Sequence, residues 1–237
     1  MSFFNLRGFS SKNRLKKTLP GSSPISPLSS PTLLSPSGGS LSEGNPLYLH
    51  PLYSHSSVVK GSFQKIVVLP PYVEANEWIS SNLFDFFHHL NLLYGTLTDF
   101  CTLKKCPTMS GGPGVEYLWN EPNSKKPQKL PAPQYIDYVM TRIQNLLDDE
   151  SLFPIKQGVE FSSSFTPVVK GLFSQIFRVY AHIYHNHFDT VLHLSLEAHL
   201  NSQFSHFILF ALHFNLLEKK EIAPLAPLIA EFEQQSS

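Results

Sequence analysis

TPVVKGLFSQIFRVYAHIYHNH, residues 166–187, is the stretch that decides the fold, because it has the markings of one long helix. Thr166 has a side chain suited to capping a helix N-terminus, and Pro167 suits the first helical position. A second stretch, QFSHFILFALHFNLL at residues 203–217, is apolar nearly all round. A helix with that pattern has no polar face for solvent, so it belongs at the centre of the molecule. Two long helices, one of them central, are therefore predicted.

Further helices are predicted on either side of this pair. Apolar residues recur at helical spacing over residues 74–98 and over residues 133–147. Residues 189–200 are predicted to form another helix, Asn201 to cap the helix after it, and a short last helix to end near Glu233. The fold class predicted from these segments is all-α, a helical bundle.

Two segments are not expected to be helical. Residues 64–69 lie before Pro70 and Pro71 and are expected to be extended. Residues 101–129 are rich in Gly, Pro and Lys and are expected to form a loop, with one short strand at residues 115–119. The bundle is therefore predicted to contain at most a short β-hairpin.

The N-terminal part of the chain has a different composition. Ser, Pro and Gly dominate there, and such a segment cannot bury enough apolar surface to offset its conformational entropy. We expect a disordered tail over residues 1–57 and one folded domain over residues 58–237. Four Ser-Pro pairs are either linker composition or phosphorylation sites, each phosphate adding about −1.5 to −2 charge; they begin at Ser23, Ser26, Ser30 and Ser35.

The overall composition excludes several classes of protein. The chain has 237 residues, with 18 Lys and Arg against 18 Asp and Glu, so no global charge favours nucleic acid. No stretch reaches the roughly 18 apolar residues of a membrane span, and the N-terminus lacks the apolar run of a secretory signal. Two cysteines are fewer than a disulfide-stapled secreted domain normally has. We expect a cytoplasmic protein without nucleic acid binding or membrane insertion.

Cysteine and histidine residues form a candidate metal site. Cys101 and Cys106 are separated by four residues on the predicted loop, and three histidines end the long helix. Two thiolates and two imidazoles are a standard tetrahedral set for Zn²⁺. The alternative is two reduced cysteines and some surface histidines. On a regular helix His182 and His185 share a face, whereas His187 joins His182 only if the helix ends there.

A series of motifs carries a resemblance to a known family. From about residue 60 to the C-terminus the chain resembles the Mob (Mps-one-binder) family of kinase coactivators. The motifs occur in this order: Glu77-Trp-Ile79, Asp85-Phe-Phe87, Leu93-Tyr-Gly95, Phe100-Cys101, Cys106-Pro-Thr-Met109, Tyr135-Ile-Asp-Tyr138, Leu152-Phe-Pro154, Phe177-Arg-Val-Tyr-Ala-His182, Ile183-Tyr-His-Asn-His-Phe188, Glu197-Ala-His-Leu-Asn201 and Ala223-Pro-Leu225.

The resemblance implies a Mob/phocein-type bundle with a loop clipped to it by structural Zn²⁺. The family's zinc ligands fall on Cys101, Cys106, His182 and His187. The implied function is a non-catalytic adaptor that binds the basic N-terminal region of an NDR/LATS-type AGC protein kinase and promotes its active conformation.

A branch of the family is also indicated. Residues 1–5, 59–63 and 193–199 resemble the fungal type-two Mob, which implies an NDR-type kinase partner, recruitment to sites of polarised growth or division, and a role in cell polarity, morphogenesis and cell separation. The alternative is a type-one Mob scaffold in mitotic exit, cytokinesis and Hippo-type signalling.

The kinase-binding surface is expected on the helix that begins near residue 74. Glu74, Glu77, Trp78 and Asp85 fall within about 100° of arc on such a helix. In the Mob family this face takes the basic segment of the kinase. The alternative is a core Trp78 beside a solvated helix face.

One departure from the family bears on phosphopeptide binding. Type-one Mobs hold a phosphothreonine peptide with three bases, whose positions match Ser174, Gln175 and Arg178. Only the arginine is kept, and Lys170 lies one turn before Ser174 as a partial substitute. A phosphate needs charged donors, so we expect a residual basic site of Lys170 and Arg178 with little affinity for phosphopeptides.

An enzyme is the competing functional class. A zinc ion with four protein ligands has no open position for water or substrate. The sequence also has no Gly-rich phosphate loop, nucleophile elbow or HExxH motif. We expect no catalytic activity.

Overall fold

The computed structural model describes residues 45–120, 126–156 and 158–236 of the chain. Within them the regular secondary structure is almost entirely helical. Two 3₁₀ turns, η1 (Leu47–Leu49) and η2 (Ala223–Leu225), accompany α1 (Pro51–Ser54), α2 (Phe63–Ile66), α3 (Ala75–Gly95), α4 (Ala132–Leu147), α5 (Phe165–Asn186), α6 (Phe188–His193), α7 (Glu197–His213), α8 (Lys219–Ile222) and α9 (Ala226–Ser236). The predicted all-α class is confirmed.

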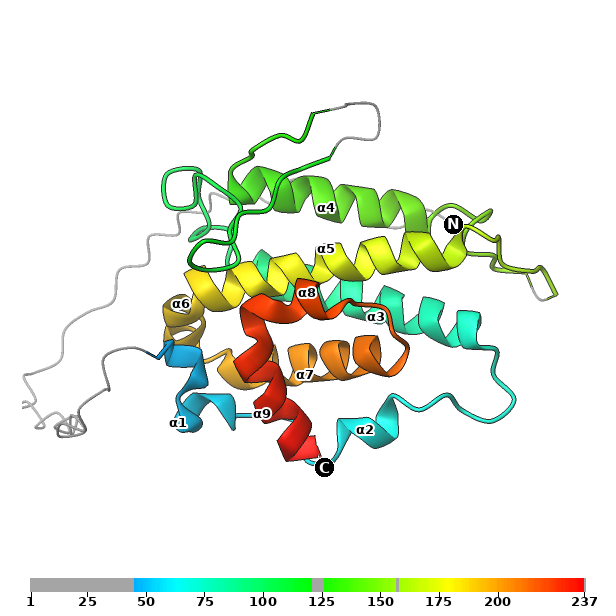
Figure 1. Cartoon of the computed structure of the whole chain (residues 1–237), viewed down its shortest axis with the longest axis horizontal. Helices are drawn as coiled ribbons and strands as arrows, with labels where there is room; N and C mark the ends of the chain where they lie inside the picture. Colours follow the sequence, from blue (N-terminus) through cyan, green and yellow to red (C-terminus); the bar gives the residue numbers. More distant parts are fainter. Residues whose placement is uncertain (1–44, 121–125, 157, 237) are drawn as a thin grey trace, which may run out of the picture. The chain divides into compact units, whose positions relative to one another are not determined.

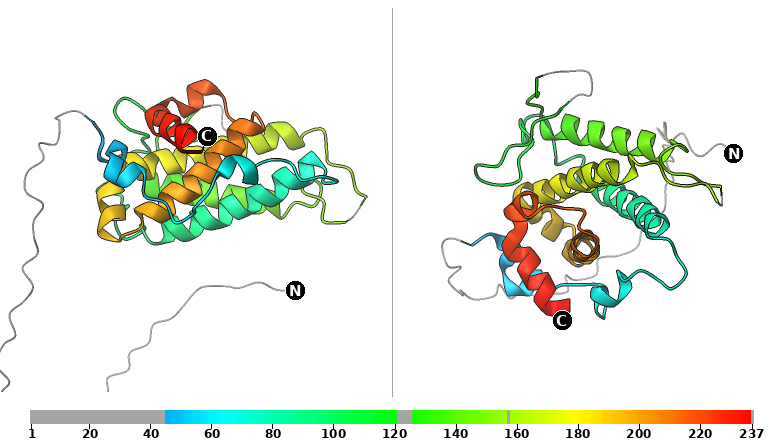
Figure 2. Two further views of the ribbon diagram at one scale, coloured as in Figure 1. Left: turned by 90° about the horizontal axis from the view of Figure 1, so that it is seen from below. Right: turned by 45° about the vertical axis from the view of Figure 1, so that its right-hand side comes forward.

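Four long helices form the body of the described domain. α3, α4, α5 and α7 alternate in direction along the chain (Figures 1 and 2). α3 packs against α4, α5 and α7, and α4 also packs against α5. Helices that alternate in direction are those of an up-down-up-down bundle. The short C-terminal helix α9 crosses α7 and reaches η1 near the start of the described chain.

α7 is the central helix, as its sequence predicted. Buried residues occur on all sides of it, from Leu200 to Ala211. Its Phe207 stacks on Phe173 of α5, with ring centroids 5.3 Å apart and planes 13° apart. Phe86 of α3 meets Phe207 edge-on at 5.5 Å. Such aromatic pairs add to the stabilisation by area burial and link three helices through one cluster.

The loop between α3 and α4 contains very little β-structure. Two isolated antiparallel bridges, Ser110 with Glu116 and Trp119 with Gln128, are present in the described part of this loop. The prediction of at most a short hairpin is therefore confirmed. The loop is also held to the bundle by Trp119, which is buried and meets Tyr135 edge-on at 5.5 Å.

Four local predictions were wrong. Residues 64–66, part of the segment 64–69 expected to be extended, are helical in α2. Thr166 lies inside α5, and Ser164 occupies the N-cap position. The helix expected over residues 189–200 is interrupted, because Ser195 adopts a left-handed φ of 55° between α6 and α7. This interruption places Asn201 inside α7 rather than at its cap.

The order expected to begin near Val58 begins earlier. Residues 47–54 form η1 and α1, and Tyr48 is buried in the core. The tail predicted over residues 1–57 is therefore wrong for residues 45–57. The physical reason is that Tyr48 and Tyr53 pack edge-on against Phe188, with ring centroids 6.0 Å and 6.2 Å away. The four Ser-Pro sites lie outside the described residues.

No described helix is both long and apolar enough to cross a membrane.

Candidate functional site

Four side chains converge at one end of α5. One ligand atom from each of Cys101, Cys106, His182 and His187 lies within 4.8 Å of all the others, and all four residues are buried. The Sγ atom of Cys101 lies 3.6 Å from Nε2 of His182, and the Sγ atom of Cys106 lies 3.4 Å from Nε2 of His187. Two sulfurs and two imidazole nitrogens so arranged match the donor set of a tetrahedral metal centre.

The loop after α3 positions the two cysteines. The amide of Cys101 donates to the carbonyl of Leu97 at 2.9 Å, and the amide of Cys106 donates to the carbonyl of Thr102 at 2.8 Å. The carbonyl of Cys106 then accepts from the amide of Ala132 at 3.0 Å, at the start of α4. These bonds turn both thiols toward α5.

The end of α5 resolves which histidines join the cysteines. α5 stops at Asn186, and His187 has φ −133° and ψ 8°, outside the helical region. This break brings the imidazole of His187 back to that of His182, with ring centroids 5.1 Å apart. His185 faces elsewhere: its Nε2 lies 3.0 Å from the carbonyl of Pro224 and 3.2 Å from the hydroxyl of Tyr48.

The hydrogen bond made by Nδ1 of His182 leaves Nε2 available to bind a metal ion. Its Nδ1 lies 2.9 Å from the carbonyl oxygen of Ser110, and only a protonated Nδ1 can donate to a carbonyl. Nε2 then has a free lone pair, and it is Nε2 that faces the cysteines. Orientation of a ligand histidine by a backbone carbonyl is common in metal sites. No side-chain pattern in the sequence could have identified Ser110, because its backbone makes the contact.

Burial sets the protonation of these groups when no metal is bound. Burial raises the pKa of the Cys101 thiol to about 12, with a smaller contribution from Cys106. Burial also lowers the pKa of His187 to about 4, helped by the neighbouring His182 and Lys105. Two neutral imidazoles and two thiols are what a metal ion would meet, and binding would release the thiol protons. The four residues thus fit a metal ion, which would supply a crosslink between the loop and α5.

The acidic residues of the predicted kinase-binding surface lie on the outside of α3 and are called the acidic strip below. Glu77 and Asp85 are exposed within the helix, and Glu74 is exposed at its N-cap position. Trp78 differs from these three, because it is partly buried and packs against the core. Its indole N–H lies 3.4 Å from the carbonyl of Val67, and its ring meets Phe210 at 6.5 Å.

The positions matching the type-one basic trio lie on α5, and Ser174 among them contacts α8. Ser174 is buried, and its hydroxyl donates to Oε1 of Glu221 at 2.5 Å. Arg178 donates to the hydroxyl of Tyr135 at 3.0 Å and covers the ring of Tyr117 at 5.3 Å. Lys170 is exposed. A carboxylate therefore lies beside the serine that stands where type-one Mobs have a base.

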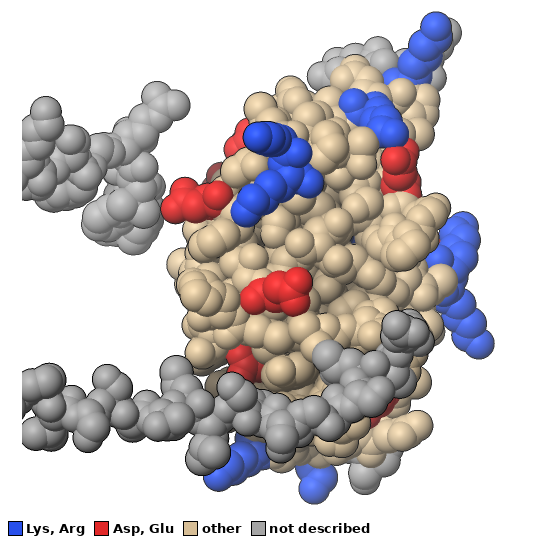
Figure 3. All heavy atoms as spheres, turned by 90° about the vertical axis from the view of Figure 1, so that its left-hand side faces the viewer, with Lys and Arg blue, Asp and Glu red and all other residues tan. Residues whose placement is uncertain are grey.

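Charge is not concentrated on the face drawn in Figure 3. Acidic and basic side chains occur there in small groups separated by uncharged surface. That face offers no continuous basic track for a phosphate backbone.

Comparison with known proteins identifies the family. The sequence model of the Mob1/phocein family matches residues 55–225. The chain is 50% identical over 190 residues to the CBK1 kinase activator protein MOB2 of Candida albicans, covering 80% of this chain and 60% of that protein. It is 48% identical over 189 residues to the protein of the same name in Saccharomyces cerevisiae, covering 80% and 66%.

A third fungal relative is matched over most of its length. The maintenance of ploidy protein mob2 of Schizosaccharomyces pombe is 45% identical over 195 residues, covering 82% of this chain and 80% of that protein. The chain spans less than two thirds of the length of the Candida and Saccharomyces relatives. The family match extends over most of the described domain and includes all four candidate metal ligands. The chain therefore belongs to the Mob1/phocein family.

Proposed function

We propose that this chain is a non-catalytic adaptor that binds and activates an NDR/LATS-type protein kinase. The observation that carries the proposal is the match, over about 80% of this chain, to two fungal proteins named as activators of the CBK1 kinase. The chain has the helical bundle and the exposed acidic helix that such an adaptor needs.

The kinase segment docks on the outer face of α3. Glu74, Glu77 and Asp85 are exposed there, and carboxylates on a helix face steer and register a Lys- and Arg-rich segment. Trp78 supplies its partly exposed ring beside them, where the aliphatic stem of a Lys or Arg side chain can pack or a guanidinium can stack. The ligand is the basic N-terminal extension of the kinase.

Activation follows from a preference between two kinase conformations. An adaptor that binds the active arrangement more tightly than the inactive one shifts the population toward it. The adaptor orders the N-terminal extension and holds it against the kinase lobe with the regulatory helix. No chemical step is required of the adaptor itself.

The metal is zinc, and its role is structural. Cys101, Cys106, His182 and His187 supply four ligands, which completes a tetrahedral shell and leaves no position for a substrate. The bound ion fixes the loop after α3 to the end of α5, two segments that are 81 residues apart in sequence.

The type-two branch is the better match for the biological setting. Two of the positions that carry bases in type-one Mobs are Ser174 and Gln175 here, which disfavours phosphopeptide scaffolding of the type-one kind. The adaptor then acts in cell polarity, morphogenesis and cell separation, in the cytoplasm at sites of growth or division. Phosphorylation at Ser23, Ser26, Ser30 or Ser35 tunes location or choice of partner.

The test is reconstitution with a purified NDR-type kinase. Addition of this chain is expected to raise the kinase's rate of phosphorylation of a peptide substrate, and the kinase's isolated N-terminal fragment is expected to compete with this effect. A fragment with its Lys and Arg residues replaced by Gln is the control and should not compete. An unchanged kinase rate at saturating adaptor would contradict the proposal.

A further inference from the structure

Tyr72 is the most exposed large hydrophobic side chain among the described residues. Its exposed fraction is 107%, the full value of an isolated side chain, so no described part of the domain packs against it. Single exposed apolar side chains are common on protein surfaces and need no explanation by themselves. The ring nevertheless contributes nothing to the packing of this domain, and the backbone that carries it is unusual.

The backbone at Tyr72 has a conformation that glycine normally supplies. The amide of Val73 donates to the carbonyl of Pro70 at 3.3 Å, which closes a four-residue turn with Pro71 and Tyr72 at its centre. Tyr72 has a φ of 66° in this turn. A left-handed φ at the third position of a turn favours Gly or Asn, because a larger side chain crowds the backbone. Glycine at position 72 would therefore relieve strain and remove no contact within the domain.

The turn lies at the N-terminal end of α3. The indole N–H of Trp78 lies 3.4 Å from the carbonyl of Val67, which holds the start of the segment 67–74 against the first turns of the helix. Glu74, at the end of that segment, is exposed at the N-cap position of α3. Tyr72 and Glu74 are two residues apart, so their Cα atoms lie within about 7 Å of each other. The exposed ring is therefore continuous with the first carboxylate of the acidic strip.

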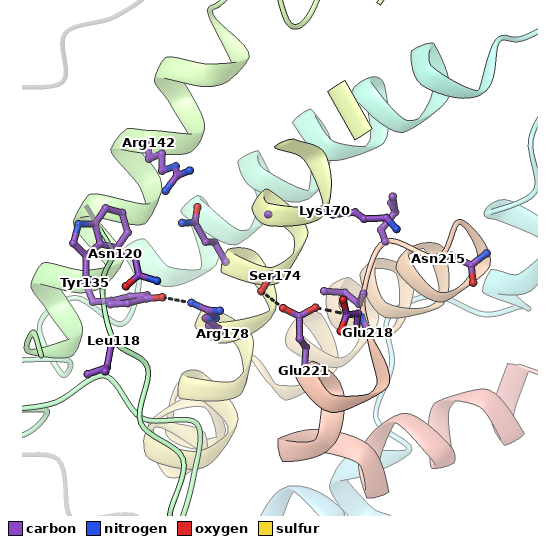
Figure 4. Close-up of a pocket in the computed structure, with 15 residues that line it drawn as sticks. Leu118, Asn120, Tyr135, Arg142, Lys170, Ser174, Arg178, Asn215, Glu218 and Glu221 are labelled. Carbon is purple, nitrogen blue, oxygen red and sulfur yellow. Dashed lines mark hydrogen bonds between the residues drawn. The ribbon is translucent and has the colours of Figure 1, made fainter. Parts of the chain in front are cut away.

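This surface is separate from the cavity drawn in Figure 4. That cavity has a volume of about 470 Å³ and lies between α4, α5 and the start of α8. Neither α3 nor the segment 67–74 contributes a residue to its lining. A role for Tyr72 is therefore independent of the α5 face that carries Ser174.

An aromatic ring beside a carboxylate favours an arginine as its ligand. A guanidinium can form two parallel hydrogen bonds with a carboxylate and can also place its planar face over an aromatic ring. Contact of this kind with a ring raises affinity by about two- to fivefold at an exposed site. The ammonium of a lysine is a compact point charge without a planar face, so it matches the two groups less well.

We propose that Tyr72 is a docking residue for the kinase, and that its ring covers an arginine of the basic segment that pairs with Glu74. This inference rests on the proposed function and adds to it a residue that lies outside α3. The turn of residues 70–73 holds the ring away from the domain, where an incoming segment meets it. Tyr72 makes the surface selective for Arg over Lys at one position of the segment.

The experiment is a calorimetric titration of the full chain with the purified basic N-terminal fragment of an NDR-type kinase. Tyr72→Gly is expected to bind the fragment at least about fivefold more weakly than the unmodified chain. Its melting temperature is expected to be equal or higher, because glycine adopts the left-handed φ of this turn without strain. A loss of affinity without a loss of stability separates docking from a structural role.

Three further variants of the chain make the result specific. Tyr72→Phe keeps the ring and is expected to bind the fragment within about twofold of the unmodified chain. Tyr72→Leu keeps an apolar side chain without the ring and is expected to bind about two- to fivefold more weakly. Ile155→Ala is the control, since Ile155 is 78% exposed in the loop between α4 and α5 and is expected to change nothing.

The partner arginine is found by changing the fragment. Each arginine of the fragment is replaced in turn by lysine. One replacement is expected to weaken binding to the unmodified chain by about two- to fivefold and to have little effect on binding to Tyr72→Leu, because the ring contact is already lost there. Glu74→Gln is expected to reduce the effect of the same replacement.

The outcomes separate this inference from the proposed function. If the unmodified chain does not bind the fragment, the proposed function fails and the inference fails with it. If the chain binds and Tyr72→Gly binds equally well, the proposed function stands and the inference fails. Arginine-to-lysine replacements with equal effects on the unmodified chain and on Tyr72→Leu would also overturn it. So would a change in the sedimentation coefficient of the chain alone on Tyr72→Gly, which would assign the ring to a contact between two copies.

Discussion

The side chain of Asn201 donates a hydrogen bond of 2.7 Å to the backbone carbonyl of Tyr53, which joins α7 to α1. The same amide donates to the carbonyl of Ser56 at 2.9 Å, and its oxygen accepts from the hydroxyl of Tyr184 at 2.9 Å. Asn201 is buried, and its hydrogen bond with Tyr184 is buried as well, whereas those to Tyr53 and Ser56 are partly buried. The N-terminal boundary of the folded domain therefore lies before residue 57.

Two truncations test this boundary. Removal of residues 1–44 is expected to leave the melting temperature unchanged. Removal of residues 1–56 also deletes the buried Tyr48 and two of the three hydrogen-bond partners of Asn201, and is expected to cost at least about 3 kcal/mol of unfolding free energy. For a domain of this size that lowers the melting temperature by roughly 6–12 °C. Thermal unfolding by circular dichroism measures both, and equal melting temperatures would count against the boundary.

Loss of the metal is expected to destabilise the fold. The freshly purified protein should contain one zinc ion per chain by elemental analysis. His187→Ala should lose the ion and lower the melting temperature, because structural zinc contributes folding free energy of several kcal/mol. His193→Ala is the matched control, since His193 is exposed in the next helix and is not one of the four clustered residues. Absence of zinc from protein that was purified without a chelator would contradict the prediction.

Charge reversal on α3 is expected to weaken kinase binding while leaving the fold intact. The variant Glu77→Lys with Asp85→Lys changes two exposed side chains. Its affinity for the basic N-terminal fragment of the kinase should fall at least about tenfold, which is about 1.4 kcal/mol. Calorimetric titration at two salt concentrations measures this, and the loss should be larger at low salt. If the variant and the unmodified chain bind the fragment equally well at both salt concentrations, the fragment docks elsewhere.

Phosphothreonine peptides are expected to bind the unmodified chain weakly or not at all. Ser174→Lys with Gln175→Arg restores two bases and should raise the affinity for such a peptide. The gain should be larger when Glu221→Gln is added, because Glu221 would otherwise pair with the new lysine beside it. Fluorescence anisotropy with phosphorylated and phosphatase-treated peptide distinguishes the cases. Tight, phosphate-dependent binding by the unmodified chain would refute this.

A pair of glycines in the loop tests the packing around His185. Gly112 has φ 109°, and a Cβ built there would lie 2.7 Å from Cε1 and Nδ1 of His185. Gly112→Ala is expected to cost about 1–3 kcal/mol in addition to its backbone strain, because the imidazole must leave its contacts with Pro224 and Tyr48. Gly114 has φ 74° and open space around the same position, so Gly114→Ala should cost only its backbone strain, about 1 kcal/mol. Equal losses in urea unfolding would mean that His185 moves freely.

Helices with a clear apolar period were predictable from the sequence, and so was the grouping of Cys101, Cys106 and His182 in the candidate metal site. α3, α4 and α5 begin and end within a few residues of the expected positions, because each has a buried stripe of its own. The choice of His187 over His185 needed the family resemblance, since it depends on where α5 ends.

Features that depend on distant partners were not predictable. Residues 47–54 have no apolar period. Their order depends on the hydrogen bond from Asn201 and on packing against Phe188. The same holds for Ser174, whose contact with Glu221 spans 47 positions of the chain. The missing base at position 174 is visible in the sequence, but the carboxylate of Glu221 beside it is visible only in the structure.

The separation between the metal ligands has a consequence for the rate of unfolding. Cys101 and His182 are 81 positions apart, so the complete ligand set exists only after α5 has formed and the loop has docked against it. If the ligand set is completed only after the folding transition state, a metal ion bound there slows unfolding and leaves the rate of folding nearly unchanged. Such an ion would set the lifetime of the native domain rather than the speed at which it forms.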